Sequence, residues 1–165
     1  MSKADTAGPN YDVEIDANEL AADIAELSAR RARKAAEYNR GARNEPVWLD
    51  YEPGDLTQYQ RWAIKEEAAR MAFANVIAML QPADKYGPNS RYVDDGAVKV
   101  RTLLRELSRR GSETNERRNG HDINSKQAGE EHSAYAEVVS LIREEYGVGW
   151  PRLDDIGGNP IQEDL

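Results

Sequence analysis

Apolar residues recur every three or four positions in four stretches of the chain, and each stretch predicts an amphipathic helix. The first predicted helix covers residues 16–40, with Asp16 as its N-cap and Gly41 after its last turn. Its apolar stripe contains Leu20, Ile24 and Leu27. Arg31 and Lys34 then occupy the positions where apolar residues would continue the stripe. We therefore predict that only the first half of this helix packs on the protein's own core.

The second predicted helix covers residues 56–81 and stops at Pro82. Phe73 lies at the centre of its regular apolar stripe, and the half from Met71 to Leu80 is apolar on nearly every side. A helix that is apolar all round is usually buried among other helices. We therefore predict that this helix is the central element of the core.

Two further helices are predicted in the second half of the chain. One opens at Asp94 or Asp95 and closes at Gly111, a residue type suited to the position after a helix C-terminus. The stripe of this third helix consists of Val93, Ala97, Val100, Leu104 and Leu107. The fourth helix covers residues 130–146, and Gly147 follows it. Its stripe consists of Tyr135, Val138, Val139, Ile142 and Tyr146.

A polar stretch separates the third and fourth predicted helices. Residues 112–129 contain a single large apolar side chain, that of Ile123. A segment with so little apolar surface cannot supply a buried face, so it is predicted to be a long exposed loop.

These elements predict an all-α fold of four helices, in which the second, third and fourth form a three-helix core and the first is partly extended. An N-terminal arm is expected at 1–15, a helical domain with the polar loop at 16–146, and an irregular, extended C-terminal tail at 147–165. Three bulky apolar residues in the tail predict that it docks on the helices or on a partner. They are Trp150, Leu153 and Ile156.

Composition narrows the class of protein. The 165 residues carry a formal net charge of −8 and contain no cysteine, which excludes disulfides, thiolate metal sites and cysteine nucleophiles. No apolar run reaches the roughly 18 residues of a membrane span, and the first residues resemble no secretory signal. We therefore expect a cytoplasmic protein that does not enter membranes. The 16 arginines against six lysines, with abundant alanine, are typical of a GC-rich genome and suggest a phage protein, which would place it in a virion.

The charge is unevenly distributed along the chain. Residues 1–29 have a net charge of −6 and residues 30–43 one of +5, while residues 97–118 have +4 and residues 119–165 have −7. Arginine pairs bidentately with phosphate, so the two basic stretches predict an alternative function in nucleic-acid binding. The residues for it are Arg30, Arg31, Arg33, Arg101, Arg105 and Arg109. The acidic net charge of the whole chain opposes this alternative, because nucleic-acid-binding domains are usually basic.

Catalytic chemistry has no recognisable pattern in this sequence. Asp16, Glu19, Asp23 and Glu26 form a carboxylate ladder on the first helix, but the second helix offers no facing pair for a metal. The histidines His121 and His132 are not placed like metal ligands. No phosphate-binding glycine loop or nucleophile elbow occurs. We therefore predict no enzyme activity, no cofactor and no metal.

The leading hypothesis is a helical interaction or adaptor protein that acts as a small subunit of a larger assembly. The first helix is acidic in its first half and basic in its second, so antiparallel pairing would bring opposite charges together. We predict such pairing with a second copy, or with a partner helix of the opposite charge order. The predicted partner-binding residues are Leu20, Ile24, Leu27, Arg30, Arg31, Arg33, Lys34, Trp150, Leu153 and Ile156.

Overall fold

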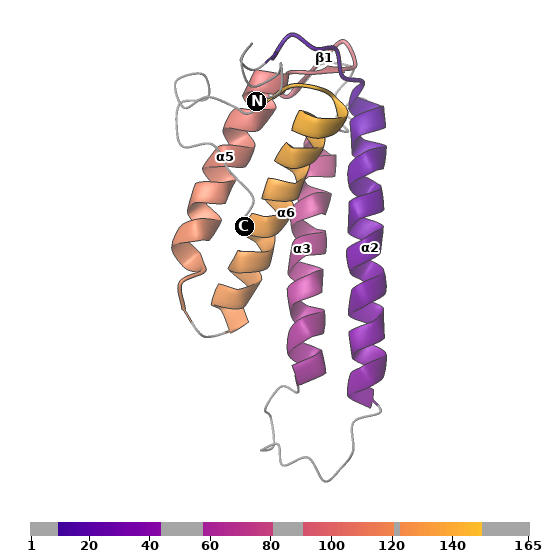
Figure 1. Ribbon diagram of the computed structural model, residues 1–165, viewed down its shortest axis with the longest axis vertical. Coiled ribbons are helices and arrows are strands. Elements are labelled where there is room, and N and C mark those ends of the chain that lie inside the picture. The colour runs from indigo at the N-terminus through magenta and orange to yellow at the C-terminus, as the bar shows by residue number, and fades with distance from the viewer. Residues whose placement is uncertain (1–9, 44–57, 81–90, 121–122, 150–165) are drawn as a thin grey trace.

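The computed structural model describes residues 10–43, 58–80, 91–120 and 123–149. In these ranges the chain forms four helices and one small hairpin (Figure 1). The helices are α2 (Ala17–Arg43), α3 (Gln58–Leu80), α5 (Val100–Arg117) and α6 (Ile123–Glu145). The strands of the hairpin are β1 (Val93–Asp94) and β2 (Ala97–Val98). The predicted all-α arrangement of four helices is confirmed.

The helices form a bundle in which α2 packs against α3, α3 against α6, and α6 against α5. Figure 1 shows α2 and α3 side by side over most of their length, and at one end they reach beyond α5 and α6. The bundle therefore has an end where all four helices meet the hairpin and an opposite end formed by α2 and α3 alone. Of the first helix, only the end that reaches beyond α5 and α6 is extended from the bundle.

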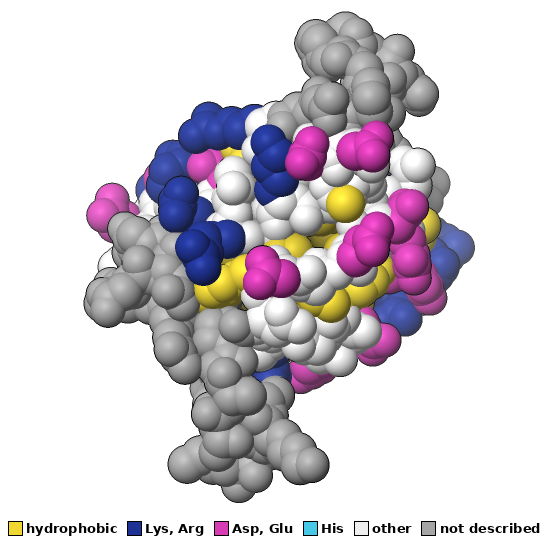
Figure 2. All heavy atoms as spheres, turned by 90° about the horizontal axis from the view of Figure 1, so that it is seen from above, with side chains coloured by type: hydrophobic (Ala, Val, Ile, Leu, Met, Phe, Trp, Pro, Cys, Tyr) yellow, Lys and Arg dark blue, Asp and Glu magenta, His cyan; other side chains and the backbone are white. Residues whose placement is uncertain are grey.

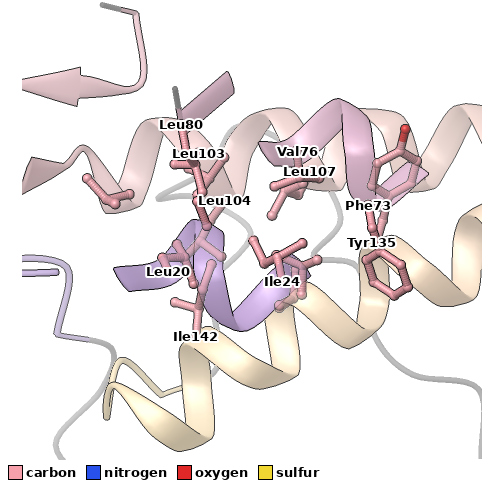
Figure 3. Close-up of a cluster of buried hydrophobic side chains, with 14 of the residues drawn as sticks. Leu20, Ile24, Phe73, Val76, Leu80, Leu103, Leu104, Leu107, Tyr135 and Ile142 are labelled. Carbon is pink, nitrogen blue, oxygen red and sulfur yellow. The ribbon is translucent and has the colours of Figure 1, made fainter. Parts of the chain in front are cut away.

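The core takes side chains from all four helices (Figure 3). Phe73, Leu104 and Ile142 are at most 1% exposed, as the stripes predicted. Leu20 and Ile24 of α2 are 0% exposed in the same cluster, and Ala35 in the second half of α2 is 1% exposed. The prediction of a three-helix core was therefore wrong, because α2 packs along much of its length. The second half of α2 buries alanine, and a search for a stripe of large apolar residues does not detect it.

The boundaries of α2 agree with the prediction at one end only. Asp16 is the N-cap: its Oδ1 accepts hydrogen bonds from the backbone N–H groups of Asn18, at 2.8 Å, and Glu19, at 3.0 Å. Gly41 does not end the helix. A Cβ atom added there would lie 3.0 Å from the ring of Tyr59 on α3, so this glycine allows the two helices to approach closely.

A hairpin replaces the predicted first turn of the third helix. Asp95 and Gly96 have φ values of 49° and 80°, the left-handed conformations that a two-residue hairpin turn requires. The pair therefore turns the chain back, and the helix begins only at Val100. The N–H of Val98 donates to the carbonyl of Ile15 at 2.8 Å, which ties the segment before α2 to the hairpin.

The segments outside the predicted helical domain pack on it where the structure describes them. Ile15 and Val148 are each 1% exposed, and the N–H of Asn10 donates to the carbonyl of Val148 at 2.7 Å. The predicted arm therefore does not extend to residue 15, and the predicted tail does not begin at residue 147, because residues 10–15 and 147–149 pack on the bundle. Residues 1–9 and the tail residues Trp150, Leu153 and Ile156 lie outside the described residues.

The predicted polar loop at 112–129 is largely helix. Helix α5 continues to Arg117, and α6 begins at Ile123. Gly111, Thr114 and Ala128 are buried at this end of the two helices, and the Nδ1 atom of His132 lies 2.9 Å from the carbonyl oxygen of Gly111. Small side chains allow the helix backbones to come close, and this packing leaves no large apolar residue for a sequence pattern to detect.

Helix α3 packs on both α2 and α6, as expected of a central element, but it is not covered on nearly every side. Met71 is 57% exposed and Trp62 is 36% exposed. These two residues lie on opposite sides of α3, so parts of two sides of the helix reach the surface.

Replacement of Phe73 or Ile24 by alanine should lower the free energy of unfolding by about 2–5 kcal/mol each, because both side chains are 0% exposed. Urea denaturation followed by circular dichroism measures the change. Met71→Ala on the same helix as Phe73 is the control, and it should leave stability within about 0.5 kcal/mol of the parent. A wild-type midpoint for Ile24→Ala would show that α2 is not part of the core.

Candidate partner-binding groove

A groove of about 510 Å³ runs between α2 and α6. We call it the α2–α6 groove. Helix α2 lines it with Leu27, Arg30, Arg31 and Lys34, and α6 lines it with Glu137, Ser140, Leu141, Glu144 and Glu145. The four α2 residues are all among those predicted to bind a partner. The α6 side was not predicted, because nothing in the α6 sequence indicates which helix its polar face will meet.

Arg31 forms ion pairs with three carboxylates on two other helices. Its Nη1 atom lies 3.0 Å from Glu66 Oε2 on α3 and 3.4 Å from Glu130 Oε2 on α6, and its Nη2 atom lies 2.8 Å from Glu137 Oε1. Lys65 Nζ also lies 3.7 Å from Glu130 Oε1. The Arg31 network therefore joins three helices through one guanidinium group.

The ionised state of Arg31 is favoured despite its burial, with 18% of the side chain exposed. Burial alone lowers the pKa of the guanidinium, but the hydrogen bond that it donates to Glu66 and the charge of Glu137 outweigh it, and the pKa of Arg31 is raised. Arg31 is thus a positive charge that the protein's own carboxylates hold in place.

These contacts correct several predicted partner-binding residues. Leu20 and Ile24 lie in the chain's own core, so the predicted pairing of two first helices through Ile24 is wrong. Arg31 is bound by three glutamates and does not offer its charge to a partner or to phosphate. The sequence shows that a charge interrupts the stripe, but not that facing helices supply carboxylates for it.

The groove has a basic and an acidic end. Tyr146, directly after α6, contacts Asp23 of α2, and Glu137 of α6 contacts Arg31, so α2 and α6 run antiparallel. Exposed Lys34 therefore lies toward the end of the groove where α6 begins, and exposed Glu145 toward the end where α2 begins. Figure 2 views the molecule from above, at the end with the hairpin, where acidic side chains gather on the side of α2 and basic ones on the side of α5.

At the acidic end of the groove, a short hydrogen bond links Tyr146, directly after α6, to α2. The hydroxyl of Tyr146 donates to Asp23 Oδ2 at 2.6 Å. Burial first, and then this bond to a carboxylate, raise the pKa of Tyr146, so the phenol stays protonated at physiological pH. The bond links the end of α6 to α2 above the groove.

The second arginine-rich stretch is compensated within the chain. Arg109 Nη2 lies 2.6 Å from Glu106 Oε1, Arg110 Nε lies 3.1 Å from the same oxygen, and Arg117 pairs with Glu131 at 3.0 Å. The remaining predicted phosphate-binding residues there also have internal contacts. Arg101 lies 4.8 Å from the ring centre of Tyr11, and Arg105 is exposed but interacts within the chain.

Three basic residues of α2 have no ion-pair partner among the described residues: Arg33, Lys34 and Arg40. All three are exposed. Arg30 is 62% exposed and pairs only with Glu26, at 3.3 Å. A group of uncompensated positive charges therefore lies on the second half of α2.

An aromatic cluster occupies the end where α2 and α3 extend beyond the other helices. The rings of Tyr38 and Trp62 have centroids 5.3 Å apart, and Tyr59 lies at the same distance from Trp62 in an edge-to-face arrangement. Tyr59 is 37% exposed and Trp62 is 36% exposed. By helical spacing Trp62 lies on the same face of α3 as buried Phe73, yet it is partly exposed.

The carboxylate ladder of the first helix has structural partners. Asp16 caps the helix, Asp23 accepts the hydrogen bond from Tyr146, and Glu26 pairs with Arg30. Within the described ranges no group of three or more His, Asp or Glu side chains is arranged to hold a metal ion. His132 is buried against the Gly111 carbonyl, and His121 lies outside the described residues.

Comparison with known proteins gives no match. No protein-family model matches the sequence, and neither the characterised proteins nor the solved structures include one similar to it. None of the described helices has the length and apolar character that a membrane crossing requires.

Replacement of Arg31 by methionine should lower the free energy of unfolding by about 3 kcal/mol, because it leaves the carboxylates of Glu66 and Glu137 without their cation and Glu130 with Lys65 alone. Arg33→Met on the exposed side of the same helix is the matched control and should change stability by less than about 0.5 kcal/mol. Adding Glu66→Gln to Arg31→Met should restore part of the loss. Equal denaturation midpoints for the two single variants would contradict a structural role for the network.

Glu106 should make the protein less stable in acid. Its hydrogen bond from Arg109, and then that from Arg110, outweigh burial and lower the pKa of Glu106 to about 2, against an ordinary value of 4.5. A lowered folded-state pKa contributes stability above pH 4.5 that is lost as the pH falls toward 2, a contribution of about 1–3 kcal/mol. Glu106→Gln should therefore show a shallower loss of stability over this pH range in thermal melts. Parallel profiles for variant and parent would contradict the assignment.

Proposed function

We propose that this chain is a non-enzymatic interaction protein, a small subunit or adaptor of a larger assembly, and that it binds an amphipathic helix of a protein partner in the α2–α6 groove. The observation that carries the proposal is the groove itself, with Leu27 and Leu141 as apolar contacts between a basic and an acidic end. The phage setting expected from the composition stays a prediction.

A helix is the partner element that such a groove suits best. Leu27 and Leu141 are partly buried and pack on the core, so a partner's apolar stripe would complete their burial. Lys34 favours an acidic segment of the partner at one end, and Glu144 and Glu145 favour a basic segment at the other. Exposed ion pairs contribute only about 0–1 kcal/mol each, so the apolar contacts would supply most of the affinity and the charges the orientation.

Photo-crosslinking tests this proposal in the organism's own lysate. A benzophenone amino acid in place of Leu141 should crosslink to one partner, and mass spectrometry should locate the crosslink in a helical segment that is acidic on one side and basic on the other. The same amino acid in place of Asn115, which is exposed on α5, is the control and should not capture that partner.

Two variants then test the contacts with the identified partner by calorimetry. Lys34→Glu should weaken binding about five- to tenfold, and a compensating acid-to-base change in the partner should restore it. Leu141→Asp should abolish binding, with circular dichroism as the check on folding. Unchanged affinity for both variants would exclude the α2–α6 groove as the binding site.

Nucleic-acid binding is the second candidate function, and the structure restricts where it could occur. Arg33, Lys34 and Arg40 are exposed and lack ion-pair partners among the described residues, and they share one half of the bundle with exposed Tyr59 and Trp62. Positive charge together with exposed aromatic rings is the combination that single-stranded nucleic acid binds.

Mobility shifts with duplex and single-stranded DNA at low salt separate the two candidates. If nucleic acid is the partner, Trp62→Ala should weaken binding to the single strand, and Arg33→Glu with Arg40→Glu should abolish binding to both. Arg109→Glu is the control and should have little effect on binding, because Glu106 already compensates that arginine. The absence of any shift would remove this candidate.

A further inference from the structure

A second groove, of about 630 Å³, lies along α3 and shares no lining residue with the α2–α6 groove. Its side chains come from all four helices. Four of them are carboxamides, so we call it the amide-rimmed groove. They are Asn39 of α2, Asn75 of α3, and Asn124 and Gln127 of α6.

The four carboxamides have no hydrogen-bond partner among the described residues. Each carboxamide carries two N–H donors and a carbonyl acceptor. A peptide group carries one N–H donor and one carbonyl acceptor, so a side-chain amide can bind it at both positions. The rim of the groove therefore offers donors and acceptors to backbone groups that are not already hydrogen-bonded, and an extended segment presents such groups whereas a helix does not.

The ionised side chains of the groove are already paired with each other or with a neighbour. Arg117 Nη2 lies 3.0 Å from Glu131 Oε2, and Glu67 Oε2 lies 3.0 Å from Arg70 Nε. Their charges cancel in pairs, and this neutral lining complements an uncharged occupant. In this respect the groove differs from the α2–α6 groove, where opposite charges lie at separate ends.

The apolar part of the groove contains the most exposed large hydrophobic side chain of the described residues, Met71, with 57% of its surface accessible. Ile64 and Ala68 lie beside it on the same lining. A thioether side chain is flexible and adapts to differently shaped apolar groups. Met71 thus provides a contact for an aliphatic side chain of whatever segment the carboxamides hold.

We propose that the amide-rimmed groove binds an uncharged, extended peptide segment of a protein partner. The carboxamides hydrogen-bond its backbone, and an aliphatic side chain of the segment packs on Met71 and Ile64. The chain would then carry two separate docking surfaces of different chemistry, as a protein that bridges two partners requires. This inference uses no residue of the α2–α6 groove and does not depend on the function proposed above.

A phage-displayed library of random 12-residue peptides, selected against the full-length chain, tests the proposal. Enriched peptides should be poor in Asp, Glu, Lys and Arg and should contain an aliphatic residue. Synthetic versions of them should bind Met71→Glu at least tenfold more weakly and Asn75→Asp about three- to tenfold more weakly. Asn115→Asp and Lys34→Glu, both outside this groove, should bind normally.

Three outcomes of the selection and binding measurements would overturn the proposal. They are enrichment of charged peptides only, unchanged binding to Met71→Glu, and failure to enrich any peptide over a parallel selection against Met71→Glu. Thermal melts should show that Met71→Glu is folded, since this side chain is mostly exposed. If light scattering instead shows that Met71→Glu dissociates an oligomer, the occupant is a second copy of the chain and the proposal is wrong.

Discussion

One arginine determines how α2 sits in this bundle. Arg31 occupies a core-facing position of α2, where an unpaired charge would be unfavourable, and it is stabilised because α3 and α6 bring Glu66, Glu130 and Glu137 within 3.4 Å of it. Because its three carboxylates lie on two different helices, the guanidinium favours the register of α2 that reaches all of them. The network therefore specifies the position of α2 more narrowly than the alanines around it could, since small apolar residues pack in several registers.

The same network shapes the α2–α6 groove. Tyr146 and Asp23 join the two helices above it, and Arg31 and Glu137 join them further down. Between these polar links the apolar contact is incomplete, and Leu27 and Leu141 remain only partly buried. Polar contacts therefore link the two helices across a gap that side-chain packing does not fill.

The charge segregation of the sequence has two different meanings in the structure. Arg109, Arg110 and Arg117 of α5 pair with Glu106, Glu113 and Glu131, so much of the positive charge in this stretch is compensated by contacts within the chain. On the second half of α2, in contrast, Arg33 and Arg40 extend from the bundle without described partners. A count of charges along the chain cannot separate these cases, because the compensating carboxylates of one helix come partly from another.

The sequence by itself determined the helical class, the N-cap at Asp16 and the large apolar residues of the core, such as Phe73 and Leu104, because helical periodicity and capping act over a few neighbouring residues. Only the tertiary structure decided what covers each face. It buries Leu20 and Ile24 within the chain, and it pairs Arg31 with glutamates that are remote in the sequence. It also packs α5 on α6 through Gly111, Thr114 and Ala128. Of the predicted partner-binding residues, Leu27, Arg30, Arg31 and Lys34 line the groove, while its α6 side and the amide-rimmed groove could not be predicted. The physical reason is that a groove forms between helices that are remote in sequence, and its chemistry depends on which faces their packing leaves uncovered.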